Sequence, residues 1–165
     1  GGERGRAVRE RASDRELERV PQRILCLSIE ASGDRILAEV LRALKRLNSA
    51  CSFVGIGGES ARAEGLESVI DPRELAAHGL SEALSVLPAT LRAWRTLKRL
   101  AADVDGYLFV DAPELSMRLL RWVKRHREDR IRARSVFYLA PPQAWAWRSR
   151  RAHLLKSADL IGCLF

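Results

Sequence analysis

Residues 24–34 read Ile-Leu-Cys-Leu-Ser-Ile-Glu-Ala-Ser-Gly-Asp, an apolar run that changes abruptly into small and polar residues. The run predicts a strand over residues 23–28, which passes through Glu30–Gly33 into a helix. We expect Asp34 to cap this helix, because an Asp side chain accepts hydrogen bonds from free N–H groups at a helix start. A strand followed directly by a helix is the repeating unit of an α/β sheet. The apolar residues at helical spacing are Leu37, Val40, Leu41, Leu44 and Leu47.

The same alternation of strand and helix continues along the chain. Further strands are predicted at residues 52–56, 106–110, 134–140 and 159–165, with a weaker candidate at 66–70. Helices are predicted as a short segment ended by Gly65, a stretch over 81–102 divided at Pro88, another over 113–127, and a short basic one over 149–157. The predicted fold class is therefore α/β: a Rossmann-like, doubly wound, mostly parallel sheet with helices on both faces.

The chain divides into a charged arm and one domain. Residues 1–21 carry mixed charges with almost no apolar periodicity, a pattern that predicts disorder. Residues 22–165 are predicted to form a single domain, because the whole chain of 165 residues has the usual length of one. The sequence stops at Leu164-Phe165, inside an apolar run, so we expect this domain to be part of a longer protein.

The net charge of +8 is concentrated in the second half of the chain. Residues 1–90 contain 13 Lys and Arg against 14 Asp and Glu, whereas residues 91–165 contain 16 against 7. A basic excess of this kind favours an anionic partner: a phosphate, a nucleic acid or an acidic membrane surface. Two predicted helices carry basic stripes, either as solvated faces or as surfaces for anionic lipid. The stripes are Arg92, Arg95 and Arg99 beside Trp94, and Arg118, Arg121 and Arg125 beside Trp122.

Cysteine and histidine are too scattered to indicate a disulfide framework or a metal centre. Cys26, Cys51 and Cys163 lie in or beside predicted strands, and we expect buried free thiols in a reducing compartment. The three histidines show no metal-ligand spacing, so no metal site is expected. No apolar run approaches the roughly 20 residues of a membrane span, and the N-terminus lacks the apolar segment of a secretory signal. We therefore expect a cytoplasmic protein.

Small and polar residues follow four of the predicted strands, at the point where each strand ends. The carboxyl ends of parallel strands meet at one edge of a sheet, and ligands bind just outside that edge. We therefore expect a single site assembled from four loops. These loops are Glu30–Asp34, Gly55–Gly58, Asp111–Pro113 and Pro142–Arg148.

Each loop has a structural explanation beside the functional one. The glycines of Gly55-x-Gly57-Gly58 either cradle a phosphate with backbone N–H groups or form a tight turn that needs positive φ. Asp111 either accepts a proton from a bound hydroxyl or bonds its own downstream backbone in a turn. Capping accounts for Ser32 and Asp34 more readily than for Glu30, a carboxylate directly after an apolar strand. The Trp-rich loop, Pro142–Arg148, either packs on the domain or contacts a ligand.

Five motifs in this order resemble the lipid-A-disaccharide synthase family, bacterial glycosyltransferases of the two-domain GT-B type. The resemblance extends from about Ile24 to Phe165, and its most specific part is the Trp-Ala-Trp motif. The motifs are E-A-S-G-D at 30–34, F-V-G-I-G-G at 53–58, D-P-x-E-L-x-x-x-G-L-x-E at 71–82, V-D-A-P-E at 110–114 and P-Q-A-W-A-W-R at 142–148.

The resemblance implies an inverting transfer of a diacylglucosamine unit from its uridine diphosphate (UDP) donor to a diacylglucosamine 1-phosphate acceptor, in lipid A biosynthesis. This chain resembles the N-terminal, acceptor-side half; the donor-binding C-terminal domain is absent, and we expect the half alone to be inactive. No metal, cofactor or nucleic-acid partner is implied, and the expected location is the cytoplasmic face of the inner membrane. Asp111 is the expected general base, with Glu30 as the rival carboxylate. The expected substrate-binding residues are Glu30, Ser32, Gly33, Asp34, Gly57, Gly58, Gln143, Trp145 and Arg148.

The alternative is a non-catalytic Rossmann-like module that binds anionic lipid or nucleotide. The glycine pattern Gly55-x-Gly57-Gly58 falls short of the full G-x-G-x-x-G. No acidic residue closes the next strand in a ribose-binding position either, which argues against dinucleotide binding. The basic second half of the sequence is compatible both with this lipid-binding alternative and with the enzyme.

Overall fold

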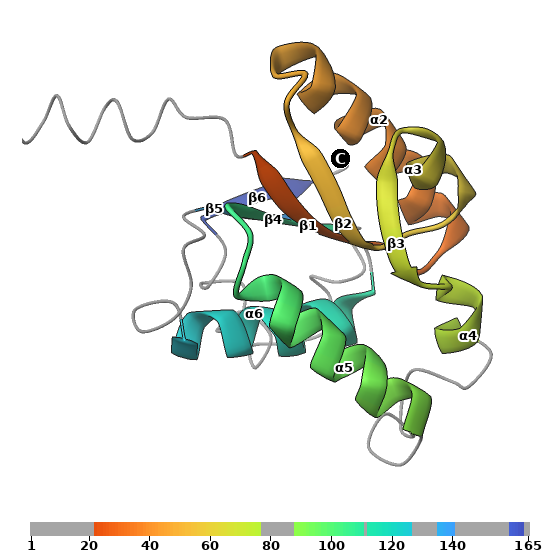
Figure 1. Cartoon of the computed structure of the whole chain (residues 1–165), viewed down its shortest axis with the longest axis vertical. Helices are drawn as coiled ribbons and strands as arrows, with labels where there is room; N and C mark the ends of the chain where they lie inside the picture. Colours follow the sequence, from red (N-terminus) through yellow and green to blue (C-terminus); the bar gives the residue numbers. More distant parts are fainter. Residues whose placement is uncertain (1–21, 77–87, 111, 127–134, 141–158, 164–165) are drawn as a thin grey trace, which may run out of the picture.

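The computed structural model describes residues 22–76, 88–110, 112–126, 135–140 and 159–163 (Figure 1). The predicted arm over residues 1–21, the first part of the stretch predicted over 81–102, and the basic helix predicted over 149–157 lie outside these ranges.

The described residues form a six-stranded sheet in which every neighbouring pair is parallel. Its order is β3-β2-β1-β4-β5-β6, which is the strand order of a doubly wound Rossmann fold. The prediction of fold class is confirmed, and so is the weaker strand candidate. The strands are β1 Arg23–Leu27, β2 Ser52–Ile56, β3 Leu66–Ile70, β4 Gly106–Val110, β5 Ser135–Ala140 and β6 Leu160–Cys163.

Helices cover both faces of this sheet (Figure 1). Helices α2 and α3 lie on one side, and α5 and α6 lie on the other. The five helices of the described ranges are α2 Ala31–Leu47, α3 Glu59–Ala63, α4 Pro72–Ala76, α5 Pro88–Ala101 and α6 Pro113–His126.

Sequence reasoning did not predict the short helix α4. The backbone N–H of Arg73 donates to Oδ1 of Asp71 at 2.9 Å, and Pro72 is the first helical residue. An Asp at the cap followed by Pro is a common helix start, because the missing N–H of Pro has no partner there anyway. The signal was therefore present in Asp71-Pro72, but the segment is only five residues long.

Alternate residues of the central strands pack into two separate hydrophobic cores, one on each face of the sheet. Leu25 and Leu27 of β1 pack with α5 and α6, whereas Ile24 and Cys26 pack with α2. This two-sided burial explains why the strands appear in the sequence as continuous apolar runs, which is typical of parallel sheets covered on both faces. The helices supply buried leucines to match, among them Leu37 and Leu41 of α2 and Leu97, Leu119 and Leu120 of α5 and α6.

Two cysteines lie in these cores as predicted. Cys26 and Cys51 are buried and carry free thiols. Burial raises the pKa of both thiols, because an apolar environment disfavours the thiolate. Both side chains therefore stay protonated and unreactive, consistent with a structural role. The side chain of Cys163 lies outside the described residues.

Gly55 is required where β2 pairs with β1. Its φ is +145°, and a Cβ added there would overlap the carbonyl oxygen of Cys26. The β2–β3 register also shifts between Gly55 and Ile56, so the strand is irregular at this point. Only glycine relieves both the backbone strain and the close approach.

We expect Gly55→Ala to destabilise the chain by roughly 3 kcal/mol or more, because a disallowed φ and a backbone overlap act together. The matched control is Gly65→Ala. Gly65 has φ +90°, but the nearest atom to its added Cβ is Nζ of the flexible Lys45. That variant should lose only about 1–2 kcal/mol. Urea titrations of both variants measure the difference, and equal losses would contradict the role assigned to the Cys26 carbonyl.

Candidate functional site

The strand order reverses direction between β1 and β4, which creates a switch point at the carboxyl edge of the sheet. The chain leaves β1 into α2 on one face and leaves β4 into α6 on the other. The two connections therefore diverge, and open α/β sheets bind ligands at a switch point of this kind. Glu30 follows one of these strands, and Asp111 directly follows the other in the sequence.

The loop after β1 presents Glu30 to solvent. Ser28 is buried; its N–H donates to the carbonyl of Ile56 at 2.8 Å, and its hydroxyl donates to the carbonyl of Glu30 at 3.5 Å. Glu30 occupies the N-cap position of α2, is exposed, and makes no side-chain capping hydrogen bond. Capping does not explain this carboxylate, so its side chain is available to a ligand. Ser32 beside it is exposed, and Gly33 is buried.

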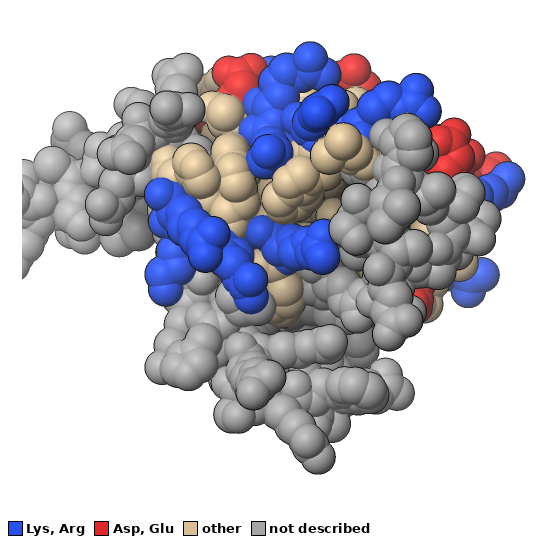
Figure 2. Space-filling view, turned by 90° about the horizontal axis from the view of Figure 1, so that it is seen from below, with Lys and Arg blue, Asp and Glu red and all other residues tan. Residues whose placement is uncertain are grey.

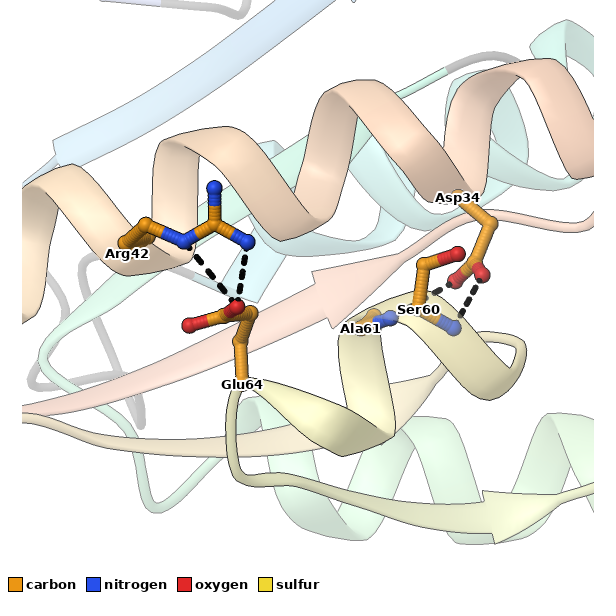
Figure 3. Close-up of polar contacts among 5 residues, drawn as sticks. All are labelled: Asp34, Arg42, Ser60, Ala61 and Glu64. Atoms are coloured by element: carbon orange, nitrogen blue, oxygen red, sulfur yellow. Dashed lines mark hydrogen bonds and ion pairs between the residues drawn. The ribbon is translucent and has the colours of Figure 1, made fainter.

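Asp34 does not cap α2, so that prediction was wrong. Asp34 lies inside the first turn of α2, and its carboxylate instead accepts hydrogen bonds from the start of α3 (Figure 3). Its donors are the backbone N–H groups of Gly58 at 2.6 Å, Ser60 at 2.9 Å and Ala61 at 3.3 Å. A local capping rule missed this contact because the partner helix is 24 or more residues away along the chain.

The positive φ that one explanation of the motif Gly55-x-Gly57-Gly58 requires is present at Gly55 and not at Gly57 or Gly58. Gly58 has φ −83°, and the described glycines with positive φ are Gly55 and Gly65. What excludes a side chain is space: a Cβ on Gly58 would lie 2.7 Å from Oδ2 of Asp34, and one on Gly57 would overlap the side chain of Leu66. Contact of either glycine with a substrate stays a prediction.

The loop after β4 begins with an unusual backbone conformation. Ala112 has φ +49° and is the only described residue other than glycine with positive φ. Its carbonyl accepts the N–H of Ser116 at 3.0 Å, which starts α6. A non-glycine residue in this region carries a strain of about 1–3 kcal/mol, and such residues concentrate at functional sites. Asp111 itself lies outside the described residues.

The remaining predicted site residues, Gln143, Trp145 and Arg148, also lie outside the described ranges. They follow β5, which pairs in parallel with β4. The carboxyl end of β5 is therefore at the same edge of the sheet as the ends of β1 and β4. The structure brings six of the predicted residues to that edge, all from the loops after β1 and β2: Glu30, Ser32, Gly33, Asp34, Gly57 and Gly58.

A cavity of about 350 Å³ lies beyond the end of β3, between α4 and α5. Asp71 and Glu74 line it from one side, and Arg92 and Thr96 of α5 line it from the other. Sequence reasoning treated the segment over 71–82 only as a family motif and did not expect a cavity there. None of the predicted site residues that the structure describes lines it, so this cavity is separate from the loops after β1 and β2.

The outer surface of α5 and α6 is basic (Figure 2). Trp94 and Trp122 are half-buried against the core, Lys98 Nζ lies 5.8 Å from the Trp94 ring centroid, and Leu91 is 48% exposed. The predicted basic stripes on these two helices are confirmed as exposed side chains. They are Arg92, Arg95 and Arg99 of α5 and Arg118, Arg121 and Arg125 of α6.

No group of three or more His, Cys, Asp or Glu side chains within the described ranges is arranged to hold a metal ion. No helix in the described part of the chain combines the length and the apolar character needed to cross a membrane.

The strand order and the helices on both faces define a Rossmann-like α/β domain with polar residues at the carboxyl edge of its sheet. The family model described as lipid-A-disaccharide synthetase matches residues 24–165. The chain therefore belongs to this family of GT-B glycosyltransferases.

Curated relatives agree with the family match. A lipid-A-disaccharide synthase of Xanthomonas campestris pv. campestris is 38% identical over 146 residues, covering 87% of this chain and 32% of the relative. The enzyme of that name from Xanthomonas oryzae pv. oryzae is 36% identical over 148 residues, covering 88% and 33%. The one from Xylella fastidiosa (strain M23) is 36% identical over 146 residues, covering 87% and 36%. The chain thus spans about a third of the length of these relatives.

We expect Glu30→Gln to change the free energy of unfolding by less than about 0.5 kcal/mol, because the carboxylate is exposed and caps nothing. Urea denaturation of the 165-residue chain measures this change. A loss of more than about 1 kcal/mol would restore the capping explanation and weaken the functional one.

Proposed function

We propose that this chain is the N-terminal, acceptor-side half of a lipid-A-disaccharide synthase. The complete protein would transfer a diacylglucosamine unit from its UDP donor to a diacylglucosamine 1-phosphate acceptor. The observation that carries the proposal is the switch point: two loops with family motifs, E-A-S-G-D after β1 and V-D-A-P-E at the end of β4, follow the two strands between which the sheet order reverses.

The donor belongs to a second domain in this proposal. A transfer between two substrates requires both to be held together in the reactive geometry, and a GT-B site lies in the cleft between two domains. The chain spans about a third of its relatives' length, which supports a division of this kind. We therefore propose that residues 1–165 alone do not catalyse the transfer.

Asp111 is the proposed general base. Its carboxylate would accept the proton of the acceptor's sugar hydroxyl while that oxygen attacks the anomeric carbon of the donor, and UDP would leave from the opposite side. Attack from the side opposite the leaving group inverts the anomeric centre. Two neighbours in the sequence support this role: β4, which is buried along its whole length, ends at Val110, and Ala112 has an unusual positive φ. The proposed transfer uses no metal and no cofactor.

The acceptor's sugar would lie along the edge formed by the loops after β1, β2 and β5. Glu30 and Ser32 are exposed there and can accept or donate hydrogen bonds to sugar hydroxyls. Gly33, Gly57 and Gly58 would shape this edge, the last two by leaving room for the side chains of Leu66 and Asp34. Gln143, Trp145 and Arg148 complete the proposed set from the Trp-rich loop.

The basic surface of α5 and α6 would contact an anionic membrane. The acceptor and the donor both carry acyl chains, so the site must lie close to a lipid surface. Exposed arginines and Leu91 form a face that suits the headgroup region (Figure 2). We propose a peripheral position on the cytoplasmic face of the inner membrane.

In the complete enzyme, Asp111→Asn should lower turnover by about 10²–10⁴-fold and leave donor affinity and stability nearly unchanged, because general-base assistance is lost while the shape is kept. Radiolabelled disaccharide formation measures turnover, and thermal unfolding checks the fold. Near-normal turnover of Asp111→Asn together with an inactive Glu30→Gln would transfer the role to Glu30.

Charge reversal at Arg95, Arg99, Arg121 and Arg125 should abolish binding of the chain to anionic vesicles, since each such side chain contributes about 1 kcal/mol near an anionic surface. Co-sedimentation at low and high salt measures the binding, which salt should weaken in the unchanged protein. Reversal of the four exposed residues Arg35, Arg46, Arg62 and Arg73 of α2, α3 and α4 is the matched control and should have little effect. Equal binding of both variants would refute the assignment of the membrane face.

A further inference from the structure

The loops after β1 and β2 and the strand β3 are joined by hydrogen bonds at the carboxyl edge. The Asp34 carboxylate accepts hydrogen bonds from the backbone N–H groups of Gly58, Ser60 and Ala61. Ser68 of β3 completes the connection: its hydroxyl accepts the N–H of Gly57 at 3.2 Å and lies 3.0 Å from the Gly57 carbonyl. The glycine turn is therefore held from both sides by side chains of neighbouring elements.

Both oxygens of the Asp34 carboxylate are engaged in this arrangement. Oδ1 accepts from Gly58 and Ala61, and Oδ2 accepts from Ser60. The residue is only 6% exposed, so water does not compete for these bonds. A set of backbone N–H groups after a glycine turn is the arrangement with which proteins bind phosphate. Here an anion of the chain itself fills that arrangement.

A second contact between α2 and α3 is a solvent-exposed ion pair (Figure 3). Arg42 of α2 donates from Nε and Nη2 to Oε1 of Glu64 at 3.0 and 2.6 Å. Glu64 raises the pKa of Arg42, mainly through this hydrogen bond. Arg42 is exposed to solvent, where ion pairs contribute little to stability. Asp34 is therefore the contact that determines how the start of α2 sits against the start of α3.

We propose that Asp34 is a positioning residue which takes the place of a ligand phosphate in the glycine turn and thereby fixes the Glu30–Gly33 segment for the acceptor. The catalytic part of this inference rests on the proposed function. Asp34 acts through the loops and not by touching substrate. The corner formed by the loops after β1 and β2 then offers the exposed carboxylate of Glu30 and no unoccupied phosphate cradle, so it selects hydroxyl or N–H donors of the ligand and not its phosphate.

The first test uses the unchanged 165-residue chain and assigned amide resonances. Inorganic phosphate and UDP, added separately, should leave the amide signals of Gly58, Ser60 and Ala61 unshifted. A saturable shift of these signals with either compound would overturn the proposal, because it would show that the turn still binds phosphate. This arm needs no variant and no enzymatic activity.

The second test compares Asp34→Asn with Glu59→Gln. Asn has the same size, but its NH₂ group cannot accept the hydrogen bond that one carboxylate oxygen receives. We expect amide exchange at Gly58, Ser60 and Ala61 to become about 10–100-fold faster, and the amide signals of residues 30–33 to shift. Glu59 is an exposed carboxylate in the first turn of α3 and should produce neither effect. Unshifted signals for residues 30–33 in Asp34→Asn would reduce Asp34 to a cap of α3 and refute the positioning role.

The third test measures the complete enzyme. Asp34→Asn should lower kcat by about 10–100-fold while the KM for the UDP donor stays the same, because displaced loops misplace the acceptor only. Glu59→Gln should keep normal kcat. An unchanged kcat in Asp34→Asn would overturn the positioning role, whereas an enzyme inactive on these substrates without any substitution would refute the proposed function and leave the first two tests decisive.

Discussion

Burial of β1 and β4 on both faces is the constraint on which the rest of this structure depends. Leu25, Cys26 and Leu27 of β1 are completely buried, and each strand pairs in parallel on both sides. A parallel strand cannot leave either face bare, so helices must follow on both sides of the sheet. The connections out of β1 and β4 therefore separate toward opposite faces. The switch point at the carboxyl edge is therefore a geometrical consequence of covering the core.

The sequence was sufficient to predict this architecture, because its signals are local. Each buried strand is a short continuous apolar run, and each long helix repeats its apolar residues at helical spacing. The end of α3 was also predictable, since Gly65 with φ +90° follows it. The helix α4 was missed because five residues give too little periodicity to detect, although the sequence Asp71-Pro72 is a recognisable helix start.

The site was predictable only in outline. Knowing that strands are parallel places their following loops at one edge, and this reasoning correctly gathered Glu30–Asp34 and Gly57–Gly58 there. It could not assign the partners of Asp34, because rules for helix caps consider only the residue's own helix. It also could not divide the glycine motif, in which Gly55 needs positive φ whereas Gly57 and Gly58 need room beside Leu66 and Asp34. Contacts between elements distant in the chain decided both cases.

The distribution of charge follows from the same topology. Part of the basic excess of residues 91–165 lies on α5 and α6. Both helices cover the same face of the sheet, where Trp94 and Trp122 pack against the core, so their exposed Lys and Arg side chains form one basic surface. The loops at the β1 and β2 ends belong to the other set of helices and carry Glu30 and Asp34. Asp34 is buried and engaged by backbone N–H groups, so the exposed carboxylate beside the β1 end is that of Glu30, and exposed charges beyond about 8–10 Å are screened. A ligand that is anionic at one end and rich in hydroxyls at the other would therefore be oriented by the fold itself, with its hydroxyls toward the β1 loop and its negative charge away from it.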